Sequence, residues 1–138
     1  MTSPTSHSLR AAGLRVTPQR RSILEVMEAT DRPLTVEEIR ARMADPQPGL
    51  PTIYRNLEHF VQQGWAESLL GHDQAMRFVR CRSEGHHHHI QCETCGRTVE
   101  VGCCGLESVL GELQTASGFQ IKRHQLQLFG TCGNCLQE

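Results

Sequence analysis

The sequence lacks any long apolar run. No stretch approaches the roughly 18 consecutive apolar residues of a membrane-spanning helix, so we expect no membrane partner. The first ten residues, MTSPTSHSLR, also lack the apolar segment of a secretory signal, which favours a cytoplasmic location. A chain of 138 residues can form one ordinary domain or two small ones, and small domains usually need a metal, disulfides or a partner chain.

A net positive charge is missing as well. The formal net charge is −1, so the overall charge does not identify a nucleic-acid-binding protein. Local charge differs, because one short segment contains four arginines and no acidic residue between them: Arg10, Arg15, Arg20 and Arg21. Such a cluster is either an ordinary solvated surface or a surface that contacts DNA phosphates, and both interpretations stay open.

The first part of the chain has the pattern of three helices. Thr17-Pro18 is a typical helix start, with the hydroxyl as N-cap and proline at the first position. Thr35 and Glu38 have the spacing of a capping box and predict a second start. A third helix is predicted from Pro51 to Gly64. One of its faces is apolar and the other polar: Ile53, Leu57, Phe60 and Val61 lie on the first, and Thr52, Arg55, Asn56 and His59 on the second.

Two short strands are predicted after these helices, over residues 65–70 and 75–81, around a turn. Three helices followed by a hairpin are typical of a winged helix-turn-helix. From His86 onward the pattern predicts a strand, a strand over 97–101, a helix over 106–116 and a strand over 119–129. The expected fold class is α+β, with a winged helix-turn-helix over 1–81, a hinge linker over 82–85, and a small α/β domain over 86–138.

Cysteine is abundant, and its spacing is informative. The chain has seven cysteines, an odd number that a framework of disulfides would not favour, and cytoplasmic thiols stay reduced. Two Cys-x-x-Cys pairs can turn four thiolates towards one ion: Cys92, Cys95, Cys132 and Cys135. A redox dithiol is the alternative, but it needs only one such pair, at a helix start in a βαβ unit. We therefore predict a structural zinc site without which the second domain does not fold.

Four consecutive histidines precede the first of these pairs. On a strand, alternate side chains point to opposite faces, so His86 and His88 share one face while His87 and His89 share the other. Each pair needs further ligands to complete a metal site. The candidates are Cys81, Glu67, Glu100, Glu107 and His124.

Cys81 decides the choice of metal. A thiolate favours zinc over the harder manganese, whereas a site of histidine and carboxylate alone leaves iron or manganese open. Glu67 and Cys81 belong to the expected wing and the histidines to the second domain. An ion shared between them would hold one arrangement of the two domains and act as a switch.

A zinc hydrolase or deaminase is a further alternative for a chain with this many histidines and cysteines. The deaminase signature requires His-x-Glu ahead of Pro-Cys-x-x-Cys, but no histidine has glutamate two residues later and Gln91 precedes Cys92. The sequence therefore argues against an enzyme with this chemistry.

Several motifs together resemble the ferric uptake regulator superfamily of bacterial metal sensors, over nearly the whole chain. They are Gly13-Leu14-Arg15-Val16-Thr17-Pro18-Gln19-Arg20, Pro51-Thr52-Ile53-Tyr54-Arg55-Asn56-Leu57, the histidine run into Cys92-x-x-Cys95-Gly96, and His124 before Gly130-Thr131-Cys132-x-x-Cys135. The resemblance implies a winged-helix DNA-binding domain, a C-terminal dimerisation domain, and homodimers on AT-rich, near-palindromic operators in double-stranded DNA. It implies no small-molecule substrate.

Within the superfamily the chain is most similar to the zinc uptake regulator branch, because Cys81 stands where that branch has a sensor thiolate. This resemblance implies a sensory site, which consists of Glu67, Cys81, His87 and His89. It implies a further site in some members, which maps to His86, His88, Glu107 and His124, or to Glu100 in place of Glu107. Each subunit would then hold about two or three zinc ions.

The resemblance also assigns residues to DNA. Tyr54 and Arg55 match positions that contact bases, and Arg15 and Thr52 match positions on the phosphate side. Arginine can bridge guanine O6 and N7, and Tyr54 can pack on a thymine methyl. The sequence thus predicts a zinc-responsive regulator that acts as a repressor, with activation left open. Sensing of iron, manganese or peroxide is the alternative, to which the histidines and Cys103-Cys104 point.

Overall fold

The computed structural model describes residues 13–15, 17–71, 73–82, 86–102 and 105–137. The chain forms two compact units, Met1–Arg82 and Ser83–Glu138. Arg82, which we expected in the linker, belongs to the first unit. The rest of the expected linker, Arg10 of the basic cluster, and Cys103-Cys104 lie outside the described residues. Within the described ranges, no helix is long and apolar enough to cross a membrane.

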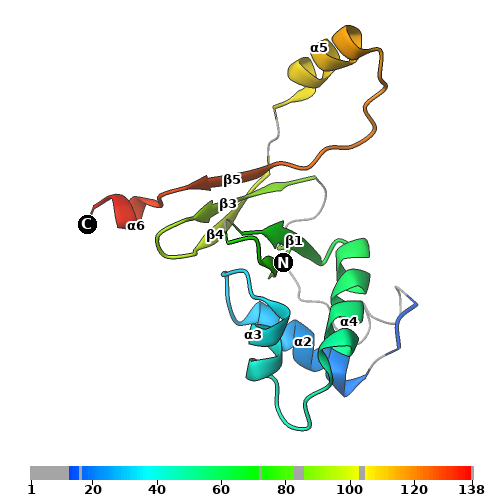
Figure 1. Ribbon diagram of the computed structural model, residues 1–138, viewed down its shortest axis with the longest axis vertical. Coiled ribbons are helices and arrows are strands. Elements are labelled where there is room, and N and C mark those ends of the chain that lie inside the picture. Colours follow the sequence, from blue (N-terminus) through cyan, green and yellow to red (C-terminus); the bar gives the residue numbers. More distant parts are fainter. Residues whose placement is uncertain (1–12, 16, 72, 83–85, 103–104, 138) are drawn as a thin grey trace. The chain divides into compact units, whose positions relative to one another are not determined.

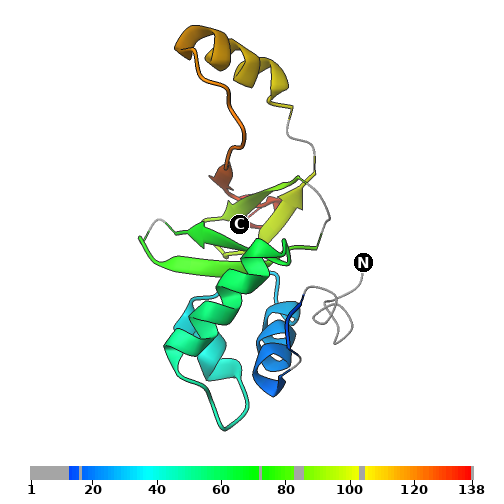
Figure 2. The ribbon, with the colours of Figure 1, turned by 90° about the vertical axis from the view of Figure 1, so that its right-hand side faces the viewer.

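The described residues of the first unit form three helices and a hairpin (Figures 1 and 2). They are α2 (Pro18–Glu28), α3 (Val36–Arg42) and α4 (Leu50–Gln62). The Arg20 amide donates to the Thr17 hydroxyl at 3.1 Å, so the predicted N-cap is confirmed. The predicted capping box of Thr35 and Glu38 is confirmed too, with both hydrogen bonds at 3.1 Å.

The hairpin consists of β1 (Ala66–Leu70) and β2 (Met76–Arg80), which pair in antiparallel fashion. An isolated bridge between Leu34 and Phe78 ties the segment before α3 to β2. At the turn of the hairpin, the Arg77 guanidinium donates two hydrogen bonds of 2.8 Å to Asp73. These bonds hold the pKa of the Asp73 carboxyl well below its usual range. The helices and hairpin confirm the predicted winged helix-turn-helix.

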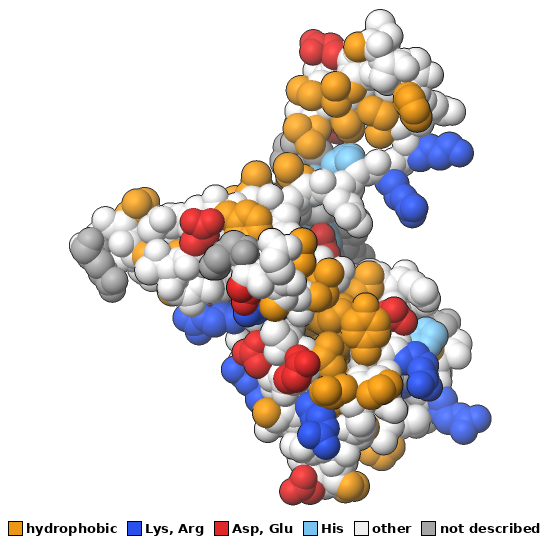
Figure 3. Space-filling view, viewed as in Figure 1, with side chains coloured by type: hydrophobic (Ala, Val, Ile, Leu, Met, Phe, Trp, Pro, Cys, Tyr) orange, Lys and Arg blue, Asp and Glu red, His pale blue; other side chains and the backbone are white. Residues whose placement is uncertain are grey.

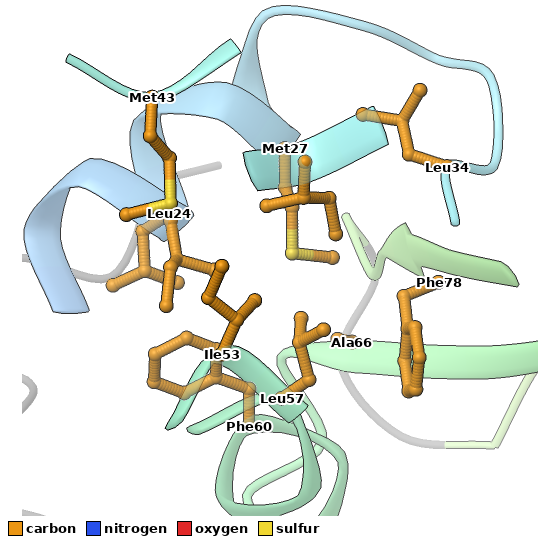
Figure 4. Packing of buried hydrophobic residues seen from close by; sticks show 11 residues of the cluster. Leu24, Met27, Leu34, Met43, Ile53, Leu57, Phe60, Ala66 and Phe78 are labelled. Carbon is orange, nitrogen blue, oxygen red and sulfur yellow. The ribbon is translucent and has the colours of Figure 1, made fainter. Parts of the chain in front are cut away.

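A continuous apolar core joins the helices of the first unit to its hairpin (Figure 4). Apolar positions at helical spacing bury one stripe of each helix, as the periodicity predicts. Full burial of one large side chain contributes about 1.5–3 kcal/mol. The core consists of Ile23, Leu24, Met27, Leu34, Ile39, Met43, Ile53, Leu57, Phe60, Ala66 and Phe78.

One residue of the predicted polar face of α4 is buried instead. The side chain of Asn56 is 8% exposed, so its predicted outward position was wrong. Its carbonyl oxygen accepts a 2.8 Å hydrogen bond from Arg20 Nε, and its amide donates to the Thr52 carbonyl at 3.0 Å. Burial is tolerated because both ends of the amide are satisfied.

The second unit contains a three-stranded sheet in the order β4-β3-β5. Strand β3 (His88–Cys92) pairs antiparallel with β4 (Thr98–Val101) and parallel with β5 (Gln127–Gly130). The two helices are α5 (Glu107–Ser117) and α6 (Gly133–Leu136). The mixed composition of the chain confirms the α+β class.

The third strand of this unit is much shorter than predicted. Residues 119–126 are not strand, and β5 begins only at Gln127, which pairs with His89. By the parallel register Leu126 would lie beside His88, the first residue of β3, so strand residues before Leu126 would need strand residues ahead of β3. Among the described residues, Phe119 and Ile121 therefore have no neighbouring strand residues with which to pair.

Candidate metal centres and nucleic-acid interface

Four cysteines converge at one end of the sheet of the second unit. Cys92, the last residue of β3, pairs with Gly130, the last residue of β5. Because the two strands are parallel, both Cys-x-x-Cys segments begin at the same end of the sheet. The four sulfur atoms lie within 4.8 Å of one another. We call this group, Cys92, Cys95, Cys132 and Cys135, the cysteine cluster.

The spacing of the cysteine cluster fits zinc. The sulfur atoms of Cys95 and Cys132 are 3.8 Å apart. Thiolates at about 2.3 Å from a tetrahedral zinc ion are separated by about 3.8 Å. The turn after Cys92 ends on Gly96 with φ 82°, a left-handed conformation that favours glycine. Local backbone and donor chemistry therefore both suit a closed site with four thiolate ligands.

Backbone amides prepare part of the cysteine cluster for a cation. The amides of Cys95 and Cys132 lower the pKa of Cys92 to about 6, and the Cys132 amide lies 3.3 Å from its sulfur. Two effects raise the pKa of Cys135 to about 12: the larger is hydrogen bonding to Cys132, and the smaller is burial. Backbone amides thus favour the thiolate form of Cys92, the form in which cysteine binds a metal.

Three histidines form a second group, which we call the histidine triad: His86, His88 and His124. The Nε2 atom of His124 lies 3.0 Å from that of His86 and 3.3 Å from that of His88. His124 belongs to the irregular segment before β5. Among the described residues, the compact group of ligand atoms consists of these three, and Glu107, the first residue of α5, is not part of it.

The other two histidines gather on Glu100. The Nε2 atoms of His87 and His89 lie 3.9 and 3.7 Å from Glu100 Oε1. His89 and Glu100 are cross-strand partners between β3 and β4, and His89 is 1% exposed. The alternation of the histidine run is therefore as predicted. The family resemblance suggested Glu100 as a possible partner of His86 and His88. The register of β4 places it beside His87 and His89 instead.

The remaining residues of the expected sensory site belong to the first unit. Glu67 lies in β1 opposite Val79, and Cys81 follows the last residue of β2. The Cys81 amide donates to the Trp65 carbonyl at 2.8 Å, and the residue is 9% exposed. The hairpin register thus places Glu67 and Cys81 at the same end of the wing, while His87 and His89 come from the second unit.

The residues expected to contact DNA gather around α4. A cavity of about 300 Å³ is lined by Arg15, Thr17, Gln19, Arg20, Thr52, Arg55, Asn56 and His59. It contains three arginines and the first turns of two helices, whose partial positive charge attracts anions. Tyr54 is 45% exposed in a neighbouring groove, and its ring packs edge-on against Phe78 with centroids 6.0 Å apart.

Sequence reasoning missed the network that holds this surface. Arg20 Nη1 donates to the Arg15 carbonyl at 2.6 Å, while its Nε bonds Asn56. Arg20 therefore attaches α2 both to α4 and to the segment that carries Arg15. The only signal was the basic cluster itself, which does not say which arginines point inwards.

Comparison with known proteins identifies the class to which this fold and these sites belong. The Ferric uptake regulator family matches residues 11–129. The chain is 36% identical over 129 residues to the zinc uptake regulation protein of Mycobacterium tuberculosis, covering 92% of this chain and 98% of that protein. It is 32% identical over 130 residues to the peroxide operon regulator of Bacillus subtilis, covering 93% and 88%.

Among solved structures, a zinc uptake regulator in complex with zinc and DNA superposes with a TM-score of 0.79. It is 25% identical, with 96% of this chain and 90% of that chain covered. The chain belongs to the Ferric uptake regulator family. It is a metal-sensing, DNA-binding transcription regulator and not an enzyme.

Proposed function

We propose that the protein is a zinc-responsive regulator that binds operator DNA as a homodimer when zinc occupies the sensory site. The observation that carries this proposal is the thiol of Cys81 at the end of β2, because thiolate ligands favour zinc over manganese. The relatives with zinc uptake in their names support it. As a DNA-binding regulator it would act in the cytoplasm, as a repressor in the first instance.

The sensory site would couple metal to DNA through the position of its ligands. Two of them, Glu67 and Cys81, are fixed by the hairpin of the first unit, and the two histidines by β3 and its neighbourhood in the second. Ligands drawn from both units favour one arrangement of the DNA-binding surface. Zinc then shifts the population towards that arrangement by its differential affinity.

The cysteine cluster would hold a structural zinc ion. Among the described residues of the second unit, the buried side chains are His88, His89, Cys92 and Thr98, so it has almost no apolar core of its own. A unit this small needs another source of stability, and four cysteine sulfurs within 4.8 Å of one another would supply one by binding zinc.

A partner chain is the other source of stability. No residue of α5 is buried, and Val109 and Leu113 are 49% and 51% exposed. Hydrophobic side chains gather over this helix in Figure 3, and Phe119 just beyond it is 74% exposed. We propose that this face packs against a second copy of the chain. The two-fold symmetry of such a dimer would match a near-palindromic, AT-rich operator.

DNA would lie on the surface of α4. The cavity beside Arg15, Thr52 and Arg55 would accept a backbone phosphate, and Arg55 and Tyr54 would reach base edges. The histidine triad would hold a further zinc ion, with Glu107 as the fourth ligand that the family resemblance suggests. Each subunit would then bind about two or three ions.

Sensing of iron, manganese or peroxide is the second candidate function. Glu100 beside His87 and His89 supports it, since histidine and carboxylate ligands also suit these metals. The similarity to a peroxide operon regulator points the same way. Metals compared at equal free concentration separate the two candidates: DNA binding that responds to iron or manganese but not to zinc supports the second.

The test of the first candidate is Cys81→Ser. DNA can be selected from a random-sequence pool with the zinc-loaded protein, and its affinity measured at a series of free zinc concentrations. We expect a steep zinc-dependent gain in the wild type and its loss in Cys81→Ser. The matched variant Cys81→Asp keeps a ligand but replaces sulfur by oxygen, and should regain binding with manganese. Equal DNA affinity of Cys81→Ser and wild type at every zinc concentration refutes the proposal.

A further inference from the structure

The residues on either side of Cys81 are attached to α2 by one carboxylate. Glu28, the last residue of α2, forms an ion pair with Arg80, whose side chain is only 5% exposed. The other Glu28 oxygen lies 3.3 Å from Arg82 Nη1. Glu28 therefore binds both neighbours of Cys81, from a position more than fifty residues earlier in the chain.

Arg82 strengthens this attachment through the helix end. Its Nη2 atom lies 3.4 Å from the carbonyl oxygens of Glu28 and of Thr30. The last turn of α2 contains no basic residue of its own, so Arg82 supplies the cation that stabilises a helix C-terminus. The segment around Cys81 is thus attached to α2 by the ion pair of Arg80 with Glu28 and by the longer hydrogen bonds of Arg82.

The opposite end of α2 holds the surface proposed to contact DNA. Arg20, in its first turn, bonds the Arg15 carbonyl and the buried amide of Asn56 in α4. One helix of 11 residues therefore has the Cys81 segment at its C-terminal end and the phosphate cavity at its N-terminal end. An α-helix of this length moves as a rigid body of about 16 Å.

We propose that Glu28 is a positioning residue that couples zinc binding at Cys81, through α2, to the position of the DNA-contacting surface. This inference rests on the proposed function, in which Cys81 is a zinc ligand. When the Cys81 segment is drawn towards bound metal, the two arginines carry Glu28 and α2 with it, and Arg20 carries Arg15 and α4. Without the carboxylate, Cys81 would still bind zinc, but its position would no longer set that of α2.

A purely structural role of Glu28 makes a different prediction. If Glu28 only stabilised the first unit, its loss would lower DNA affinity equally with and without zinc. A positioning role instead lowers the ratio of the two affinities, which is the coupling between the metal site and the DNA site. This ratio is the quantity to measure.

The experiment compares full-length wild type, Glu28→Gln and Glu25→Gln. The control, Glu25→Gln, removes the same charge from an exposed position one turn earlier on α2. For each protein, DNA affinity is measured with and without zinc, on a duplex selected by the zinc-loaded wild type. Zinc affinity is measured by competition with a chelator, and the melting temperature is recorded. We expect Glu28→Gln to lower the zinc-dependent gain by about fivefold or more, within the usual range of coupling strengths, and Glu25→Gln to leave it unchanged.

A second variant keeps the inference testable if Glu28→Gln does not fold. Arg82→Gln removes a side chain that is 40% exposed and leaves the Glu28–Arg80 pair in place, and it should lower the gain by a smaller factor. A gain in Glu28→Gln or Arg82→Gln equal to that of Glu25→Gln overturns the role of Glu28. A wild type whose DNA binding ignores zinc contradicts the proposed function instead, so the two failures are distinguishable.

Discussion

The two units of this chain bury different kinds of side chain. The first buries a cluster of eleven apolar residues, whereas the buried residues described in the second are two histidines, one cysteine and one threonine. The first unit therefore has the apolar core of an ordinary small domain, whose burial favours folding without a metal. Most buried residues described in the second are candidate metal ligands, and α5 exposes its apolar face, so the proposed function assigns its stability to bound zinc and a partner chain.

Removal of zinc should produce the largest difference in behaviour between the two units. We expect a chelator, or Cys95→Ser, to unfold the second unit, since structural zinc sites contribute about 10–16 kcal/mol of apparent binding free energy. The first unit should keep its fold. Amide NMR spectra test this, because signals of 86–137 would collapse while those of 13–82 stay dispersed. Thr94→Ser, exposed in the same turn, is the control. If the second unit remains folded without metal, zinc is not the source of its stability and the proposed difference between the two units is wrong.

A cavity in the apolar core should destabilise the first unit and leave the zinc content of the second unit unchanged. Leu57 is fully buried, and Leu57→Ala should lower the free energy of unfolding of the first unit by about 2–5 kcal/mol. Zinc content should stay unchanged. Urea denaturation followed by the fluorescence of Trp65, which packs against this core, measures the effect. The exposed neighbour Glu58→Ala is the control, and a similar loss in both variants would show that burial is not the cause.

A charge introduced on α5 tests whether the second unit is stabilised by dimerisation through this helix. Leu113→Glu places a carboxylate in the exposed apolar face and should weaken dimerisation tenfold or more, about 1.4 kcal/mol. Sedimentation at a series of protein concentrations reports the change. Glu112→Gln alters the charge of the adjacent exposed residue and should leave the dimer intact. An unchanged dimer in Leu113→Glu places the interface elsewhere.

The smallest effect is expected at the turn of the wing. The pKa of Asp73 is lowered in the folded protein, so its contribution is present above the pKa of an unfolded aspartate, about 3.9, and is lost only as pH falls through the lower folded value. An NMR titration of the Asp73 carboxyl should show a midpoint below that of a free aspartate, and Arg77→Lys should raise it. Because the pair is exposed, Asp73→Asn should hardly change stability at pH 7. A midpoint near 3.9 in the wild type contradicts this account.

Features encoded in a few adjacent residues were predictable. The caps at Thr17 and Thr35 follow from the side chains and the next three residues, and the alternation of the histidine run follows from strand geometry. The pairing of the two Cys-x-x-Cys segments follows from the chemistry of their ligands.

Features that depend on distant partners were not predictable. Asn56 lies on the polar face by periodicity, but Arg20 from another helix makes its burial favourable. Glu100 was one of several carboxylates until the register of β4 placed it beside His87 and His89. The short β5 reflects the late start of β3, which no local pattern in residues 119–126 reveals.

The sequence by itself determined the family, the order of helices and strands apart from the short α6, and the types of donor atom available to a metal, because these depend on residue identity and near-neighbour spacing. Tertiary structure alone decided which donors meet, which arginine supports Arg15, and that Glu28 binds both neighbours of Cys81. Such contacts depend on strand register and on helices brought together by long-range packing. Their free energy belongs to pairs of residues far apart in the chain, and no short segment contains both partners.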